Sequence, residues 1–112
     1  MCMKKEIIKI NKELGGKLVR PSSLDFACDK IKSEKNIYKR NACLLRAIVV
    51  DHPFDDMNKS TATIIITRNF NKHKIKCKEE PFLKGIRNIA KKNIIDLNKI
   101  ERDLRKWCPK KK

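Results

Sequence analysis

Residues 52–58 read HPFDDMN and place a histidine, two carboxylates and an amide within one short stretch. His52 can take a proton from an attacking hydroxyl, because imidazole gains and loses its proton near neutral pH. Asp56 suits a magnesium ion that keeps most of its waters and also contacts substrate phosphates. Asn58 is a good N-cap for a following helix, and helix N-termini hold phosphate oxygens. These residue types, in this order, favour phosphoryl or nucleotidyl transfer.

The segments on either side of this stretch have helical patterns. Residues 37–50 carry apolar side chains at helical spacing, and Pro53 biases His52 away from helical dihedrals, so a loop is expected to start at His52. Residues 59–71 are apolar around most of the circumference, which predicts a central, buried helix whose N-terminus emerges at the loop. The run TIIIT at 63–67 is β-prone, and a strand there is the main competing interpretation.

Apolar periodicity and turn signals divide the remaining chain into further helices. Gly15 and Gly16 are a natural helix stop, Ser22 and Ser23 offer a cap, and Asp96 offers another. Period-two strand patterns are absent from the sequence. We therefore expect one all-α domain over residues 1–112, a compact bundle of five or six helices around a central buried helix. The additional helices are expected at 4–14, about 24–32, 79–90 and 97–107.

The charge balance is strongly basic, with 29 Lys and Arg against 13 Asp and Glu, and a formal net charge of +16. Such a field attracts polyanions, including nucleic acid and acidic protein surfaces. Lysine is nevertheless scattered along the whole chain. With 5% aromatic residues, the sequence offers no platform for stacking single-stranded bases. Residues 109–112 are expected to form a basic, solvated C-terminal tail.

Several features argue for a cytoplasmic protein without a membrane association. No stretch of about 18 uncharged apolar residues occurs, and the first ten residues lack the apolar region of a secretory signal. The five cysteines are odd in number and form no C-x-x-C pair, so we expect reduced thiols. His73 and Cys77 offer only two ligands, whereas structural zinc sites need four, so a zinc site is not expected.

The stretch DHPFDDMNKSTA, residues 51–62, resembles the signature of the Fic/Doc family (death-on-curing-like proteins), H-x-F-x-[DE]-[GA]-N-[GK]-R-x-x. The agreement lies at His52, Phe54, Asp56 and Asn58 and in the spacing between them. The preceding segment KRNACLLRAIVV is similar to the helix that leads into the motif in that family. The resemblance covers about residues 20–72. It implies a compact, all-α, Fic-like fold.

This resemblance also implies an activity and residue roles. The protein would be a phosphotransferase or adenylyltransferase, moving phosphate or AMP from ATP, with Mg²⁺, to a Ser, Thr or Tyr hydroxyl of a protein. His52 would be the general base and Asp56 the magnesium ligand. Phe54 would be an anchor packed into the core, and Asn58 would contact a phosphate or the loop.

The implied anion cradle consists of Met57, Asn58, Lys59 and Ser60, and two of these depart from the family signature. Met57 replaces a glycine or alanine, and glycine reaches backbone conformations that methionine avoids. Ser60 replaces an arginine, so a bidentate phosphate contact is missing. This loss makes weak or absent activity the alternative to an active transferase. Lys59, the residue type of the Doc branch, favours phosphate over AMP as the transferred group.

Two further expectations concern regulation and substrate alignment. The family uses a flap before the motif to align an extended segment of the target, and KSEKNI, residues 32–37, falls at the corresponding place. Many Fic proteins carry an inhibitory [ST]-x-x-x-E-[GN] helix, but no Ser or Thr in this sequence has Glu four residues later. Restraint by a partner is then expected, which suits a toxin paired with an antitoxin.

The alternative is a catalytically degenerate Fic-fold module that binds nucleic acid through its basic surface. This alternative predicts an affinity that falls steeply with salt. The sequence leaves open whether AMP or phosphate is transferred, which protein is the target, whether Ser60 abolishes activity, and the oligomeric state.

Overall fold

The computed structural model describes residues 3–110, and these form six helices. The expectations for Cys2, Lys111 and Lys112 fall outside this range. Within it, no strand forms, and a single antiparallel bridge pairs Leu18 with Phe54. The prediction of an all-α bundle is confirmed. None of the described helices is long and apolar enough to cross a membrane. The helices are α1 (Met3–Glu13), α2 (Ser22–Ile31), α3 (Ile37–Val49), α4 (Asn58–Lys72), α5 (Glu79–Lys92) and α6 (Leu97–Trp107).

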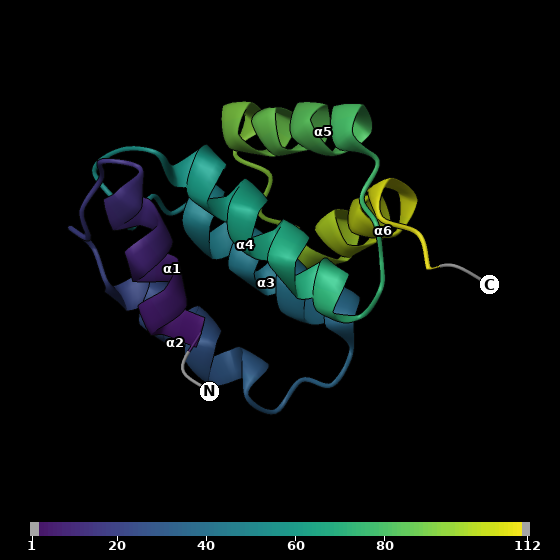
Figure 1. Ribbon diagram of the computed structural model, residues 1–112, viewed down its shortest axis with the longest axis horizontal. Coiled ribbons are helices and arrows are strands. Elements are labelled where there is room, and N and C mark those ends of the chain that lie inside the picture. Colours follow the sequence, from purple (N-terminus) through teal and green to yellow (C-terminus); the bar gives the residue numbers. More distant parts are fainter. Residues whose placement is uncertain (1–2, 111–112) are drawn as a thin grey trace.

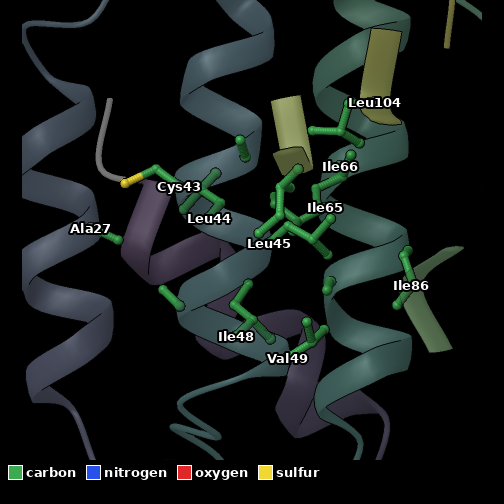
Figure 2. Close-up of a cluster of buried hydrophobic side chains, with 14 of the residues drawn as sticks. Ala27, Cys43, Leu44, Leu45, Ile48, Val49, Ile65, Ile66, Ile86 and Leu104 are labelled. Carbon is green, nitrogen blue, oxygen red and sulfur yellow. The ribbon is translucent and has the colours of Figure 1, made fainter. Parts of the chain in front are cut away.

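The centre of the bundle is α3, which packs against α2, α4, α5 and α6 (Figure 1). Nine of its thirteen residues are buried. Figure 2 shows Leu45 of α3 facing Ile65 and Ile66 of α4, and all three side chains are fully buried. A central buried helix was predicted at 59–71. The central helix is α3 instead, since it packs against four other helices. The first turn of α4, by contrast, is exposed at Lys59 and Ser60.

The β-prone run TIIIT is helical and lies inside α4. Ile65 and Ile66 pack into the core in this conformation, and tertiary burial outweighs the β-propensity of the run.

The helix caps follow the sequence predictions only in part. At the start of α6, Asp96 accepts hydrogen bonds from the N–H groups of Asn98 and Lys99, as the sequence predicts. The serine cap predicted for α2 is wrong, because α2 begins at Ser22 without a side-chain cap.

Cys77 and Cys108 form a disulfide that joins the α4–α5 segment to the residue after α6. The expectation of reduced thiols is wrong for this pair. The two cysteines are 31 residues apart, and no spacing pattern in the sequence signals their proximity. The bond also removes Cys77 as a zinc ligand. Over residues 3–110, no three His, Cys, Asp or Glu side chains are grouped to hold a metal ion.

Candidate functional site

The HPFDDMN stretch lies in the loop between α3 and α4, beside the segment that connects α1 to α2 (Figure 1). The N–H groups of Val19 and Arg20 donate to the Pro53 carbonyl over 2.9 and 3.0 Å, and the Asp55 N–H donates to the Lys17 carbonyl over 3.0 Å. Residues 17–20 therefore pair with the loop around the Leu18–Phe54 bridge and fix its backbone. The sequence analysis did not find this partner segment.

Phe54 and Asn58 hold the loop to the bundle. The Phe54 side chain is 1% exposed. The Asn58 amide accepts from the Phe54 N–H through Oδ1 over 3.1 Å and donates to the Phe54 carbonyl through Nδ2 over 3.0 Å. Asn58 is the first residue of α4 and its side chain does not cap the helix, so the N-cap prediction is wrong by one residue. The contact with the loop, one of the two roles implied for Asn58, is made by its side chain.

Met57 takes the N-cap position in a left-handed conformation, with φ 63°. His52, at the other end of the loop, also has a positive φ of 50°. A left-handed backbone costs a residue with a side chain about 1–2 kcal/mol. Such conformations persist when neighbouring contacts fix them, and they occur often at ligand sites. The hydrogen bonds from residues 17–20 and from Asn58 are these fixing contacts.

The α4 N-terminus is left without a side-chain cap. The Thr61 N–H donates to the Met57 carbonyl over 2.9 Å, so regular helical bonding starts there. The N–H groups of Asn58, Lys59 and Ser60 come before this point and have no intrahelical acceptor. Lys59 and Ser60 are exposed. This end of α4 therefore presents donors and partial positive charge at the surface.

His52 and Asp56 are both exposed, and Asp56 directly precedes Met57 at this helix end. Asp56 Oδ1 accepts from the Met57 N–H over 2.7 Å, and the second carboxylate oxygen stays available to a ligand. The neighbouring Asp55 has a structural role, because its Oδ1 accepts from the Lys17 N–H over 2.8 Å. Of the two carboxylates in the HPFDDMN stretch, Asp56 is the candidate metal ligand.

Arg20 is a site cation that the sequence analysis missed. Its guanidinium donates to the His52 carbonyl from Nε over 3.1 Å and from Nη2 over 2.7 Å. The contact fixes the backbone at His52. Neither of its two hydrogen bonds involves the imidazole ring. Arg20 lies 32 residues before His52 in the chain, and only the pairing of residues 17–20 with the loop brings them together.

Asn11 supports the motif loop and the first turn of α4 from the buried side. It is fully buried on α1, and its Nδ2 donates to the Asp56 carbonyl over 2.9 Å and to Thr61 Oγ1 over 3.1 Å. Thr61 Oγ1 in turn donates to the Met57 carbonyl over 2.7 Å. Gly16 packs so closely against Asn11 and the Asp56 carbonyl that a side chain there would collide with both. In the sequence, Asn11 resembles an ordinary polar residue of a lysine-rich helix.

Exposed side chains dominate the outer side of the motif loop, at His52, Asp55 and Asp56, and continue into α4 at Lys59 and Ser60. The predicted flap segment lies at the opposite end of α3, a helix about 20 Å long. There Arg40 Nη1 donates to the carbonyls of Ile31 and Glu34 over 2.6 and 2.9 Å and holds the segment in a closed turn. The flap prediction is therefore wrong.

Replacing Asn58 by alanine is expected to lower the free energy of unfolding by about 1–3 kcal/mol, because both Phe54 backbone groups lose their partner. Urea unfolding followed by circular dichroism measures this. Asn88→Ala, at an exposed position of α5, is the matched control and should change stability by about 0.5 kcal/mol or less. Equal effects of the two substitutions would show that Asn58 does not hold the loop.

His52, Asp56 and the first turn of α4 thus belong to one loop-and-helix segment that Phe54 and Asn58 fix to the bundle, and the side chains of His52 and Asp56 are exposed. Lys17, Arg20 and Asn11 complete its support. In comparisons with known proteins, no family model and no curated protein matches the chain.

Proposed function

We propose that the protein is a small Fic/Doc-like transferase that moves a phosphate-containing group from ATP to a Ser, Thr or Tyr hydroxyl of another protein. The observation that carries the proposal is the uncapped N-terminus of α4, with exposed Asp56 directly before its N-cap residue and exposed His52 in the same loop. An anion binds to such a helix end through backbone N–H groups, and the loop supplies a carboxylate for a metal ion and an imidazole for a base.

The first turn of α4 would bind the phosphates. The N–H groups of Asn58, Lys59 and Ser60 are the donors, and the Lys59 ammonium adds a charge that attracts the nucleotide. One free oxygen of Asp56 suits Mg²⁺, which takes one or two carboxylates and completes its shell with phosphates and water. Bound there, Mg²⁺ would neutralise charge on the phosphates.

His52 would act on the incoming hydroxyl. The imidazole takes the hydroxyl proton as the oxygen forms its bond to phosphorus, and the bond from phosphorus to the bridging oxygen breaks. Attack at the γ-phosphorus releases ADP, and attack at the α-phosphorus releases pyrophosphate. Lys59 favours the first of these. The Arg20 contact with the His52 carbonyl is the positioning interaction for the base.

The exposed loop residues also bear on partners. His52, Asp56 and Lys59 are exposed, so a protein bound across the loop would obstruct the end of α4. A toxin that an antitoxin protein restrains in this way is the form of the proposal that we favour. The second candidate is the catalytically degenerate binding module, and Ser60 is the residue that favours it, because the signature arginine is missing.

Restoring that arginine separates the two candidates. Wild-type protein and Ser60→Arg are incubated with a cell extract and with ATP labelled at the α or the γ position. We expect γ label on a protein, and an increase of about 10-fold or more with Ser60→Arg, because arginines of this kind contribute about 10³-fold or more elsewhere.

The matched control is Ser22→Arg, which adds the same charge at an exposed position at the start of α2. It should leave the labelling unchanged. If neither the wild type nor Ser60→Arg labels any protein with either nucleotide, the transferase proposal fails and the binding module remains.

A further inference from the structure

A second surface feature lies at the opposite end of α3 from the loop. A cavity of about 600 Å³ is lined by residues of the α2–α3 joint, the α4–α5 joint and the segment after α6. Four of its seven lining residues are basic, three lysines and one histidine, and none of the seven carries a carboxylate. The lining residues are Lys35, Asn36, Ile37, His73, Lys74, Ile75 and Lys110.

The end of α4 turns two of these residues to the surface. The Ile75 N–H donates to the Phe70 carbonyl over 2.9 Å, and the Lys74 N–H donates to the Asn71 carbonyl over 3.0 Å. This pair of bonds is a Schellman motif, with Lys74 in the left-handed conformation at φ 59°. Ile75 is buried beneath the turn, while His73 and Lys74 are exposed.

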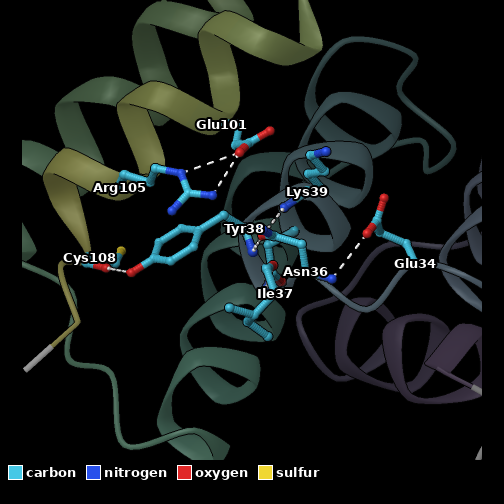
Figure 3. Close-up of polar contacts among 9 residues, drawn as sticks. Glu34, Asn36, Ile37, Tyr38, Lys39, Glu101, Arg105 and Cys108 are labelled. Carbon is cyan, nitrogen blue, oxygen red and sulfur yellow. Dashed lines mark hydrogen bonds and ion pairs between the residues drawn. The ribbon is translucent and has the colours of Figure 1, made fainter.

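The segment after α6 brings Lys110 to the same place. Cys108 is tied to Cys77 by the disulfide, and its carbonyl accepts from the Tyr38 hydroxyl over 2.6 Å (Figure 3). Lys110 follows two residues later, and its Nζ lies 5.8 Å from the centroid of the Tyr38 ring. Chain segments far apart in sequence thus contribute lysines to one cavity.

The N-terminus of α3 adds to the positive potential. Asn36 caps this helix by accepting from the N–H groups of Tyr38 and Lys39, so the positive end of the helix dipole faces the cavity that Asn36 and Ile37 line. A neighbouring cavity of about 290 Å³ shares Ile37 and His73.

This neighbouring cavity adds Arg40 and Lys72 to the positive surface. Its one acidic lining residue, Glu6, forms an ion pair with Arg68 over 3.7 Å. Arg68 therefore offsets the only carboxylate in the lining. Positive charge continues across both cavities.

We propose that these two adjoining cavities bind the phosphate backbone of a nucleic acid without reading its base sequence. Lysines spread over two cavities suit a row of phosphates better than they suit one isolated phosphate group. Contacts with phosphates carry no information about the base sequence. The nearest aromatic ring, Tyr38, is 2% exposed and offers no face for stacking a base. Burial also raises the pKa of Tyr38, which keeps its hydroxyl neutral and bonded to the Cys108 carbonyl.

The test compares two triple variants that remove the same number of charges. The cavity variant is Lys35→Gln/Lys74→Gln/Lys110→Gln. The control is Lys5→Gln/Lys12→Gln/Lys91→Gln, which alters exposed lysines outside both cavities. Binding of a fluorescent oligothymidylate of about 20 nucleotides is measured by anisotropy between about 50 and 200 mM salt, and circular dichroism checks folding.

We expect the cavity variant to bind at least about 10-fold more weakly than wild type and to lose about 2 from the slope of log K against log salt, because three single-strand contacts are removed. The control should change affinity less than about 3-fold. An equal loss in the control would show that binding follows total charge, and absence of wild-type binding would overturn the proposal directly. As a competition control, unlabelled oligothymidylate and inorganic phosphate are each used to displace the fluorescent oligomer. If inorganic phosphate displaces it at the same concentration as the unlabelled oligomer, the cavities bind a single phosphate, and the proposal of a backbone site is overturned.

Discussion

His52→Ala is expected to lower the rate of γ-phosphate transfer to a target protein by about 10²- to 10⁴-fold, the usual contribution of a positioned general base. The substitution removes the only imidazole of the motif loop and leaves the contacts of the loop backbone in place, because Arg20 binds the His52 carbonyl rather than its ring. The measurement is label transferred per unit time from γ-labelled ATP in a cell extract.

The chain supplies its own control for this result. It has two histidines, and the second, His73, is exposed at the far end of α4. His73→Ala should leave the transfer rate unchanged. A wild-type rate in a folded His52→Ala protein would remove the general base from the proposed mechanism, even if Ser60→Arg raised the rate.

Phe54→Ala is expected to lower the free energy of unfolding by about 3–5 kcal/mol, the range for deleting a fully buried phenyl ring. Phe54 is 1% exposed and is the one large apolar side chain that the loop places in the core, since the neighbouring Asp55 and Asp56 are exposed. Its loss leaves a cavity beneath the loop. Urea unfolding followed by circular dichroism gives the change in stability.

Phe26 provides the matched control, because its side chain is 63% exposed on α2. Phe26→Ala should change stability by about 0.5 kcal/mol or less. If Phe54→Ala proved as mild as Phe26→Ala, the loop would not be anchored through its phenyl ring, and the position of His52 relative to α4 would have to depend on the hydrogen bonds alone.

Local signals in the sequence predicted the helices well. The ends of α3 and α5 follow from apolar periodicity, from Pro53 and from the acidic first turn at Glu79. Gly15, with φ 100°, ends α1 as expected for glycine. Periodicity could not rank the helices by burial, because the central place of α3 depends on which neighbours pack around it.

The parts of the site that the sequence missed are long-range contacts. Asn11 meets the Asp56 carbonyl across 45 residues of chain, and Arg20 meets His52 across 32. No periodic or spacing signal encodes such pairs, since they depend on how α1 docks against α4. The same reason explains why the Cys77 to Cys108 disulfide was not expected.

The pairing of residues 17–20 with the motif loop links α1 to the site through backbone hydrogen bonds. This helix packs only on α2 and α4 among the described helices, and Asn11 and the residues that follow it hold the loop from one side. A protein that bound α1 and moved it away from α4 would break those hydrogen bonds and release the backbone of the loop that carries His52. The attachment of the N-terminal helix thus couples the position of α1 to the conformation of the motif loop.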